Sequence, residues 1–275
     1  MLMDVKGVTY SIHYLTEFTP SRPTLVCLHG FTGTSATFDC LNEARLSHNL
    51  IAIDLIGHGD TSVFVHPYRY TTASQLSDLD WIISALNLEK IDLLGYSMGG
   101  RLALSYAVKH PTKINQLILE SSSPGLSGYD ERKKRRMSDN RLACLLTDKG
   151  IHHFVDFWEN IPLFATQKKL STSTQETIRN ERLSQNPYGL AMSLRYFGTG
   201  IQPPLWDKLS LLNGVPVALL VGEYDKKFVS LANQMVEKIS RGHVITFSKS
   251  GHCIHLEKPN EFAETIRDIL ISEGP

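Results

Sequence analysis

The stretch that decides the fold is Gly95-Tyr96-Ser97-Met98-Gly99. It follows the apolar run 91–94, which is typical of a short buried strand, and it precedes residues 100–107, whose pattern favours a helix. A serine between two glycines at a strand-to-helix junction indicates a turn so tight that side chains beside the serine would clash. Such a turn holds the Ser97 hydroxyl above the sheet, beside a helix N-terminus that can face a developing negative charge. We therefore interpret Ser97 as a candidate catalytic residue.

The order of polar residues along the rest of the chain supports this interpretation. The continuous apolar run 215–221 predicts a buried parallel strand, and Asp225 lies shortly after it. The next strand-like run, 243–247, leads through a glycine to His252. Both side chains follow the C-terminal end of a strand, where open α/β sheets place their chemistry. The order serine, acid, histidine resembles that of the α/β-hydrolase fold, so the sequence predicts this fold with Ser97, Asp225 and His252 as a catalytic triad.

Two other side chains compete for places in this triad. Glu223 is on the same loop as Asp225, but Asp225 lies further out on the loop and its shorter side chain suits a fixed imidazole. His255 is the alternative base. We prefer His252, because Gly251 before it favours a tight loop, whereas the residues around His255 are typical of helix packing.

Strands and helices alternate along much of the chain, which predicts a mostly parallel sheet with right-handed crossovers. The predicted strands are an antiparallel strand at the sheet edge, 8–14, and then 24–28, 50–54, 91–94, 114–120, 215–221 and 243–247. The predicted helices of this part begin at about 36, 72, 100, 228 and 259. From about 125 to 207 no strand is expected, and helical patterns cover 130–146, 151–159, 175–184 and 190–197. We expect an α/β-hydrolase core of residues 1–124 and 208–275, with residues 125–207 as a helical cap over the active site.

Acyl or enolate chemistry needs hydrogen-bond donors for an oxyanion. The N–H of Met98, directly after Ser97, is one expected donor, and the N–H of Phe31, in the loop after strand 24–28, is the other. Arg101 lies one helical turn after Ser97 and could hold a substrate carboxylate in a bidentate pair. The residues alone equally allow an Arg101 that is bound to loop carbonyls.

The composition narrows the class of partner. The 275 residues carry 28 acidic and 28 basic side chains, so no general attraction to nucleic acid or to anionic membranes is expected. The basic run 132–136 is a solvated helix face, a nucleic-acid patch or a set of cations directed at the cleft under the cap. No apolar run approaches the roughly 20 residues that span a bilayer, and no signal-peptide core precedes the first strand, so we expect a cytoplasmic protein. The four cysteines lack metal-binding spacing, and we expect no metal site.

Four segments together resemble one family of menaquinone biosynthesis. They are residues 95–101, the cap segment 154–164 with its Trp-Glu-x-x-Pro-Leu-Phe pattern, the acid loop 222–228 and the histidine loop 251–259. These segments are similar to those of the 2-succinyl-6-hydroxy-2,4-cyclohexadiene-1-carboxylate (SHCHC) synthase family, and the resemblance covers nearly the whole chain. Many hydrolases share the core motifs, whereas the cap motif and Arg101 narrow the resemblance to this family.

The resemblance implies a set of substrate-binding residues. Carried over position by position, they are two aromatic and three basic side chains: Tyr96, Trp158, Arg101, Arg135 and Arg182. Arg132 and Arg136 are alternatives to Arg135, because a shift by one residue or one turn would exchange them, and Arg179 is the alternative to Arg182.

The resemblance also implies a lyase. Its reaction eliminates pyruvate from 2-succinyl-5-enolpyruvyl-6-hydroxy-3-cyclohexene-1-carboxylate, a small anionic tricarboxylate, without a cofactor. Ser97 would then act as a general base that is activated by His252 and Asp225. The alternative is a carboxylesterase or C–C bond hydrolase that uses Ser97 as a covalent nucleophile, because the triad is common to both. The sequence leaves open whether the protein is a monomer or a homo-oligomer.

Overall fold

The computed structural model describes residues 1–44 and 46–272. Within them, eight strands form one sheet in the order β1-β2-β4-β3-β5-β6-β7-β8. In chain order the strands are β1 (Leu2–Val5), β2 (Val8–Tyr14), β3 (Thr24–Leu28), β4 (Asn49–Ile53), β5 (Ile91–Tyr96), β6 (Ile114–Glu120), β7 (Val217–Gly222) and β8 (Gly242–Phe247). The pairs β1–β2 and β2–β4 are antiparallel, and the other pairs are parallel. This architecture confirms the predicted mostly parallel sheet.

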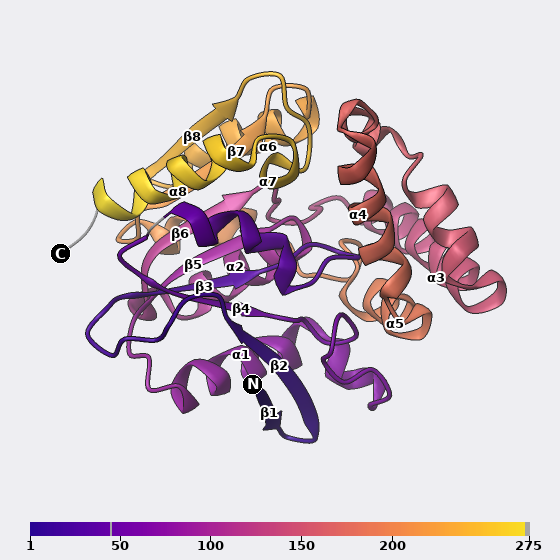
Figure 1. Ribbon diagram of the computed structural model, residues 1–275, viewed down its shortest axis with the longest axis horizontal. Coiled ribbons are helices and arrows are strands. Elements are labelled where there is room, and N and C mark those ends of the chain that lie inside the picture. Colours follow the sequence, from indigo (N-terminus) through magenta and orange to yellow (C-terminus); the bar gives the residue numbers. More distant parts are fainter. Residues whose placement is uncertain (45, 273–275) are drawn as a thin grey trace.

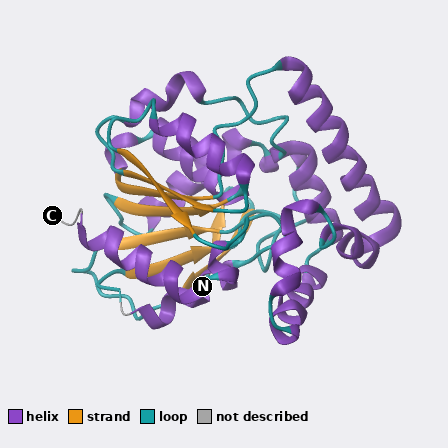
Figure 2. Ribbon diagram, turned by 90° about the horizontal axis from the view of Figure 1, so that it is seen from above, coloured by secondary structure: helices purple, strands orange, loops and turns teal. Residues whose placement is uncertain are grey.

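Helices cover both faces of the sheet, as Figure 2 shows. They include α1 (Thr72–Ala85), α2 (Met98–Lys109), α6 (Lys226–Val236), the short α7 (Ile254–Glu257) and α8 (Pro259–Ser272). Short 3-10 helices are η1 (Ser35–Ala44), η2 (Pro67–Tyr70), η3 (Pro111–Lys113), η4 (Pro162–Lys169) and η5 (Trp206–Leu212). The helix expected from about residue 36 is therefore the 3-10 helix η1.

The central strands are apolar along their whole length because both of their faces are buried. In β3, Val26 and Leu28 belong to a core that includes residues of α1 and α2. Leu25 and Cys27 point the other way, into a second core that includes residues of η1 and α8. Because the faces of these strands are filled by the two cores, catalytic side chains are expected beyond the strand ends.

Between β6 and β7 the chain forms the helices α3 (Tyr129–Trp158), α4 (Thr172–Ser184) and α5 (Pro187–Phe197). Figure 1 shows these three helices grouped on one side of the molecule, away from the C-terminus. The two helices predicted at 130–146 and 151–159 are the arms of α3, which are separated by Gly150 with φ 80° and ψ 178°. Buried residues of α3 and α5, such as Leu146 and Leu190, form a small core of their own.

The first hairpin departs from the sequence prediction. Strand β2 was expected at the sheet edge, but β1 pairs with its outer side and is itself the edge strand. The connecting residues Lys6 and Gly7 both have positive φ, at 55° and 80°. Two-residue turns of this kind match the twist of antiparallel strands, and a glycine at the second position makes them favourable.

None of the helices in the described part of the chain combines the length and the apolar content needed to cross a bilayer.

Candidate active site

Ser97 lies at the sharp turn between β5 and α2. Its backbone has φ 48° and ψ −101°, in the region that side-chain-bearing residues rarely adopt. A Cβ on Gly99 would collide with the carbonyl oxygen of Leu28, and a Cβ on Gly95 would collide with the backbone of Gly100. The two glycines are therefore required by the close approach of neighbouring backbone. The turn places the Ser97 side chain at the carboxyl end of the parallel strands.

The structure brings the three predicted triad residues together. His252 Nε2 is 3.0 Å from Ser97 Oγ, and His252 Nδ1 is 2.6 Å from Asp225 Oδ2. Asp225 is the N-cap residue of α6, and His252 follows β8 on a loop. Both are buried, with 8% and 2% of their surface exposed. When Nδ1–H donates to Asp225, Nε2 is the nitrogen that can accept the proton of the Ser97 hydroxyl.

The two competing side chains have other partners. Glu223 Oε2 accepts hydrogen bonds from Lys249 N at 2.8 Å and from Ser248 Oγ at 3.2 Å. Those two bonds lower the pKa of Glu223, with the backbone N–H of Lys249 the larger cause. His255 Nδ1 is 2.9 Å from both carboxylate oxygens of the buried Glu120. Neither side chain takes part in the hydrogen-bond chain that ends at Ser97.

Glu257 holds the loop that carries His252. Its Oε2 accepts a hydrogen bond from Gly251 N at 2.7 Å, and its Oε1 accepts one from Thr166 Oγ1 at 2.8 Å. Thr166 belongs to η4, between α3 and α4. The carboxylate of Glu257 therefore connects the His252 loop to η4.

Ser97 opens into a cavity of about 280 Å³. Its lining includes eight residues of the predicted site: Phe31, Tyr96, Ser97, Met98, Arg101, Arg135, Trp158 and His252. Met98 begins α2, where the first N–H groups of a helix lack acceptors within it. The Phe31 ring packs edge-on against Trp158, with centroids 5.5 Å apart, so it forms part of the aromatic wall.

Arg101 is bound to protein acceptors and also lies at the cavity. Its Nη1 donates to the carbonyl oxygen of Phe197 at 3.0 Å and to Gln202 Oε1 at 2.7 Å, and the residue also lines the cavity. Arg135, from α3, donates from Nε to Asp139 Oδ1 at 2.7 Å. Burial lowers the pKa of Arg101, and the charge of Arg135 lowers it further, so the two guanidinium groups repel each other across the site.

The alternatives to Arg135 point elsewhere. Arg136 Nη1 donates to the carbonyl oxygen of Gly200 at 3.0 Å, and Arg132 Nε approaches the same oxygen at 3.5 Å. Arg135 is the residue of the basic run that lines the Ser97 cavity.

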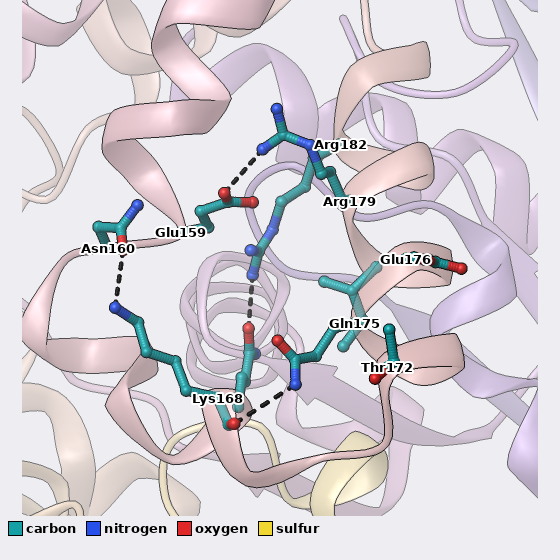
Figure 3. Close-up of a pocket in the computed structure, with 10 residues that line it drawn as sticks. Glu159, Asn160, Lys168, Thr172, Gln175, Glu176, Arg179 and Arg182 are labelled. Atoms are coloured by element: carbon teal, nitrogen blue, oxygen red, sulfur yellow. Dashed lines mark hydrogen bonds and ion pairs between the residues drawn. The ribbon is translucent and has the colours of Figure 1, made fainter.

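Arg182 lies on a different cavity, of about 400 Å³, which Figure 3 shows. Its Nη2 donates to Gln167 Oε1 at 2.9 Å, and its guanidinium lies 4.7 Å from the ring centroid of Phe164. Phe164 also lines the Ser97 cavity, whereas Arg182 does not. Arg179 lines the Arg182 cavity too, but it forms ion pairs with Asp156 and Glu159. The structure thus does not place Arg182 beside Arg101 and Arg135.

Sequence reasoning missed three residues that line the Ser97 cavity from α6: Lys227, Phe228 and Leu231, of which the first two lie in its first turn. The Phe228 ring centroid is 4.7 Å from that of His252, and Lys227 supplies a further cation. The sequence feature that could have identified Lys227 and Phe228 is their position. Both lie within three residues of Asp225, in the first turn of α6, the helix that Asp225 caps.

One group of potential metal ligands occurs in the described residues, formed by His13, Asp54 and Asp60. None of the three lines the Ser97 cavity. The Asp54 carboxylate already accepts hydrogen bonds from Ser35 N at 2.7 Å and Asp60 N at 3.1 Å, which supports a role in loop structure.

Comparison with known proteins identifies the family of this chain. The family model described as alpha/beta hydrolase fold matches residues 23–259. The chain is 40% identical over 266 residues to a Bacillus subtilis (strain 168) protein, assigned provisionally as a 2-succinyl-6-hydroxy-2,4-cyclohexadiene-1-carboxylate synthase, covering 97% of this chain and 96% of that protein. It is 31% identical over 251 residues to the synthase of the same name from Enterobacter sp. (strain 638), with 91% and 93% covered.

A solved structure points the same way. The structure of MenH from S. aureus superposes with a TM-score of 0.89 at 38% identity, covering 96% of this chain and 98% of that one. The chain therefore belongs to the α/β-hydrolase fold family and, within it, to the 2-succinyl-6-hydroxy-2,4-cyclohexadiene-1-carboxylate synthases.

Proposed function

We propose that the protein eliminates pyruvate from 2-succinyl-5-enolpyruvyl-6-hydroxy-3-cyclohexene-1-carboxylate to give SHCHC in menaquinone biosynthesis. The observation that carries the proposal is the charge of the Ser97 cavity. Among the described residues that line it, Arg101, Arg135 and Lys227 are cations, and no aspartate or glutamate is present. A wall of this kind favours a polyanion, and the substrate carries three carboxylates. A neutral ester would gain nothing from these charges.

Ser97 acts as the general base of the reaction. His252 Nε2 accepts the hydroxyl proton of Ser97, and Asp225 stabilises the resulting imidazolium. The Ser97 oxygen then removes the ring proton α to the succinyl ketone. The 3.0 Å contact between His252 Nε2 and Ser97 Oγ supplies the proton path that this step requires, and the 2.6 Å contact between His252 Nδ1 and Asp225 Oδ2 supports the stabilisation of the imidazolium.

Elimination follows through the ring alkene. The electron pair of the broken C–H bond forms a new ring double bond, the existing alkene shifts by one bond, and the C–O bond to the enolpyruvyl group breaks. The ring proton regenerates the Ser97 hydroxyl. Pyruvate leaves as its enolate, and its methylene carbon takes the proton that the His252 imidazolium gives up, which restores the neutral imidazole. The backbone N–H groups of Phe31 and Met98 stabilise the enolate oxygen of the succinyl ketone. No acyl-enzyme forms, and no cofactor takes part.

Residues 125–207 act as a cap over the reacting groups. Arg135 and Trp158 support this role, because both belong to α3 and both line the cavity of Ser97. The cap excludes water, which strengthens the electrostatic interactions of the substrate carboxylates with the cavity wall.

The test is an assay of two reactions on one preparation. Pyruvate release from the enolpyruvyl precursor is followed by coupled reduction to lactate, and p-nitrophenyl acetate hydrolysis is followed in parallel. We expect efficient pyruvate release that Ser97→Ala lowers by about 10³-fold or more. Efficient ester hydrolysis without pyruvate release would reject the lyase and support the carboxylesterase alternative.

A further inference from the structure

Lys227 differs from the other two cations of the Ser97 cavity in its partners. Arg101 donates to Phe197 O and Gln202 Oε1, and Arg135 donates to Asp139. Lys227 forms no hydrogen bond or ion pair within residues 1–44 and 46–272. Its ammonium lies 5.5 Å from the centroid of the neighbouring Phe228 ring. Lys227 is thus the cation of this wall whose charged group has no hydrogen-bond or ion-pair partner in the described part of the chain, so all three of its N–H donors are available to a ligand.

The surroundings of Lys227 favour an anion. The residue as a whole is exposed, but its ammonium is partly buried, and this partial burial is the largest cause that lowers the pKa of Lys227. The charge of Arg135 lowers it further, while the carboxylates of Asp225 and Glu131 oppose the shift. Two cations from different helices, α6 and α3, are therefore held close enough to repel each other. A bound carboxylate between them would remove this repulsion.

We propose that Lys227 binds a substrate carboxylate and is a specificity-determining residue for polyanions in the Ser97 cavity. The inference deepens the proposed function and rests on it only for the identity of the natural substrate. Lys227 lies in the first turn of α6, at the end of the helix where backbone dipoles also favour negative charge. The carboxylate site is therefore built from Lys227 on the core side and Arg135 on the α3 side.

The first experiment measures binding, so that it does not depend on turnover. Tricarballylate, a small tricarboxylate, is titrated calorimetrically into the wild-type protein and into Lys227→Met and Lys227→Arg. We expect Lys227→Met to weaken binding about tenfold or more, because a charge-assisted hydrogen bond is lost, and Lys227→Arg to retain most of the affinity. Lys226→Met is the matched control, because Lys226 is the exposed neighbour on α6 and does not line the cavity.

The second experiment measures steady-state pyruvate release by the same variants. We expect Lys227→Met to raise KM for the enolpyruvyl precursor with a much smaller change in kcat, and Lys227→Arg to restore KM. Circular dichroism melting of each variant checks that the fold is retained.

Two outcomes overturn the inference. One is a Lys227→Met variant that binds tricarballylate as tightly as the wild type. The other is a loss of affinity of the same size in Lys226→Met, which would indicate a general effect of charge. A wild-type protein that binds tricarballylate through Lys227 but releases no pyruvate would reject the proposed function and leave the Lys227 site standing.

Discussion

The thiol of Cys253 lies 2.7 Å from the phenolic oxygen of Tyr96. Cys253 directly follows His252, and Tyr96 directly precedes Ser97. Gln167 Nε2, from η4, donates to the same sulfur at 2.9 Å. A buried thiol thus connects the loop that carries His252, the end of β5 before Ser97, and η4. Burial raises the pKa of Cys253 to about 12, so the group is a neutral thiol that can both donate and accept.

Replacing this thiol should lower stability. In Cys253→Ala the buried polar atoms of Tyr96 and Gln167 lose their shared partner, which should cost about 1–3 kcal/mol of unfolding free energy. In Cys253→Ser a hydroxyl keeps both hydrogen bonds, so the loss should be smaller. Urea unfolding at pH 7 measures the difference. Equal losses in the two variants would show that the volume of the sulfur matters and its hydrogen bonds do not.

Asp225 and Glu223 provide a matched pair of acids. Asp225→Asn should lower kcat by about 10⁴-fold, because the amide no longer fixes the His252 tautomer that can accept the Ser97 proton. Glu223→Gln, on the same loop, should stay within about twofold, because its carboxylate binds Lys249 N and Ser248. Steady-state kinetics with the enolpyruvyl precursor measures both effects. A large loss of kcat in Glu223→Gln would contradict the assignment of the acid.

Glu257 should affect catalysis through the loop of His252. Glu257→Ala removes the acceptor of Gly251 N and of Thr166 Oγ1, and we expect kcat to fall about tenfold as His252 loses its fixed position. Glu261→Ala, an exposed glutamate on α8, is the control and should behave like the wild type. If Thr166→Val also lowers kcat, part of the effect comes from the hydrogen bond between Glu257 and Thr166 of η4. An unchanged kcat in Glu257→Ala would sink the prediction.

His58 should contribute to acid sensitivity. Burial, with the nearby His29 adding to it, lowers the pKa of His58 to about 3 from the ordinary 6.5. The unfolded chain therefore binds a proton that the folded protein excludes, and unfolding free energy falls as the pH drops from about 6.5 toward 3. The slope from this one group is at most about 1.4 kcal/mol per pH unit.

His58→Gln should reduce this slope between pH 6.5 and 4.5, as measured by urea unfolding at several pH values. His152→Gln, which changes an exposed histidine of α3, is the control and should keep the wild-type slope. The same slope in wild type and His58→Gln would assign the acid sensitivity to other groups.

Much of the core could be read from local patterns. The strands at 24–28 and 114–120 have the predicted bounds, because short and largely buried apolar runs differ clearly from helical periodicity, and the strand at 8–14 has its predicted bounds because apolar and polar residues roughly alternate along it. The hairpin of β1 was missed, since only one of the four residues of β1 is buried and its two-residue turn begins with Lys6, which is not a turn residue by type. The 3-10 geometry of η1 was missed as well, because the amino-acid composition of residues 35–44 does not distinguish a 3-10 helix from an α-helix.

The sequence alone determined the fold class and the order of Ser97, Asp225 and His252, because both depend on short-range patterns and on where strands end. Only the tertiary structure decided which neighbours of these residues face the cavity. Glu223 and His255 follow the same two strands as Asp225 and His252, so position in the sequence hardly separates the two pairs. In the structure, however, Glu223 binds Lys249 N, and His255 binds the carboxylate of Glu120. Arg182 packs against the Phe164 ring and lines a different cavity, whereas Lys227 lines the Ser97 cavity. The direction of a side chain depends on packing between segments far apart in the chain, and no local pattern encodes that packing.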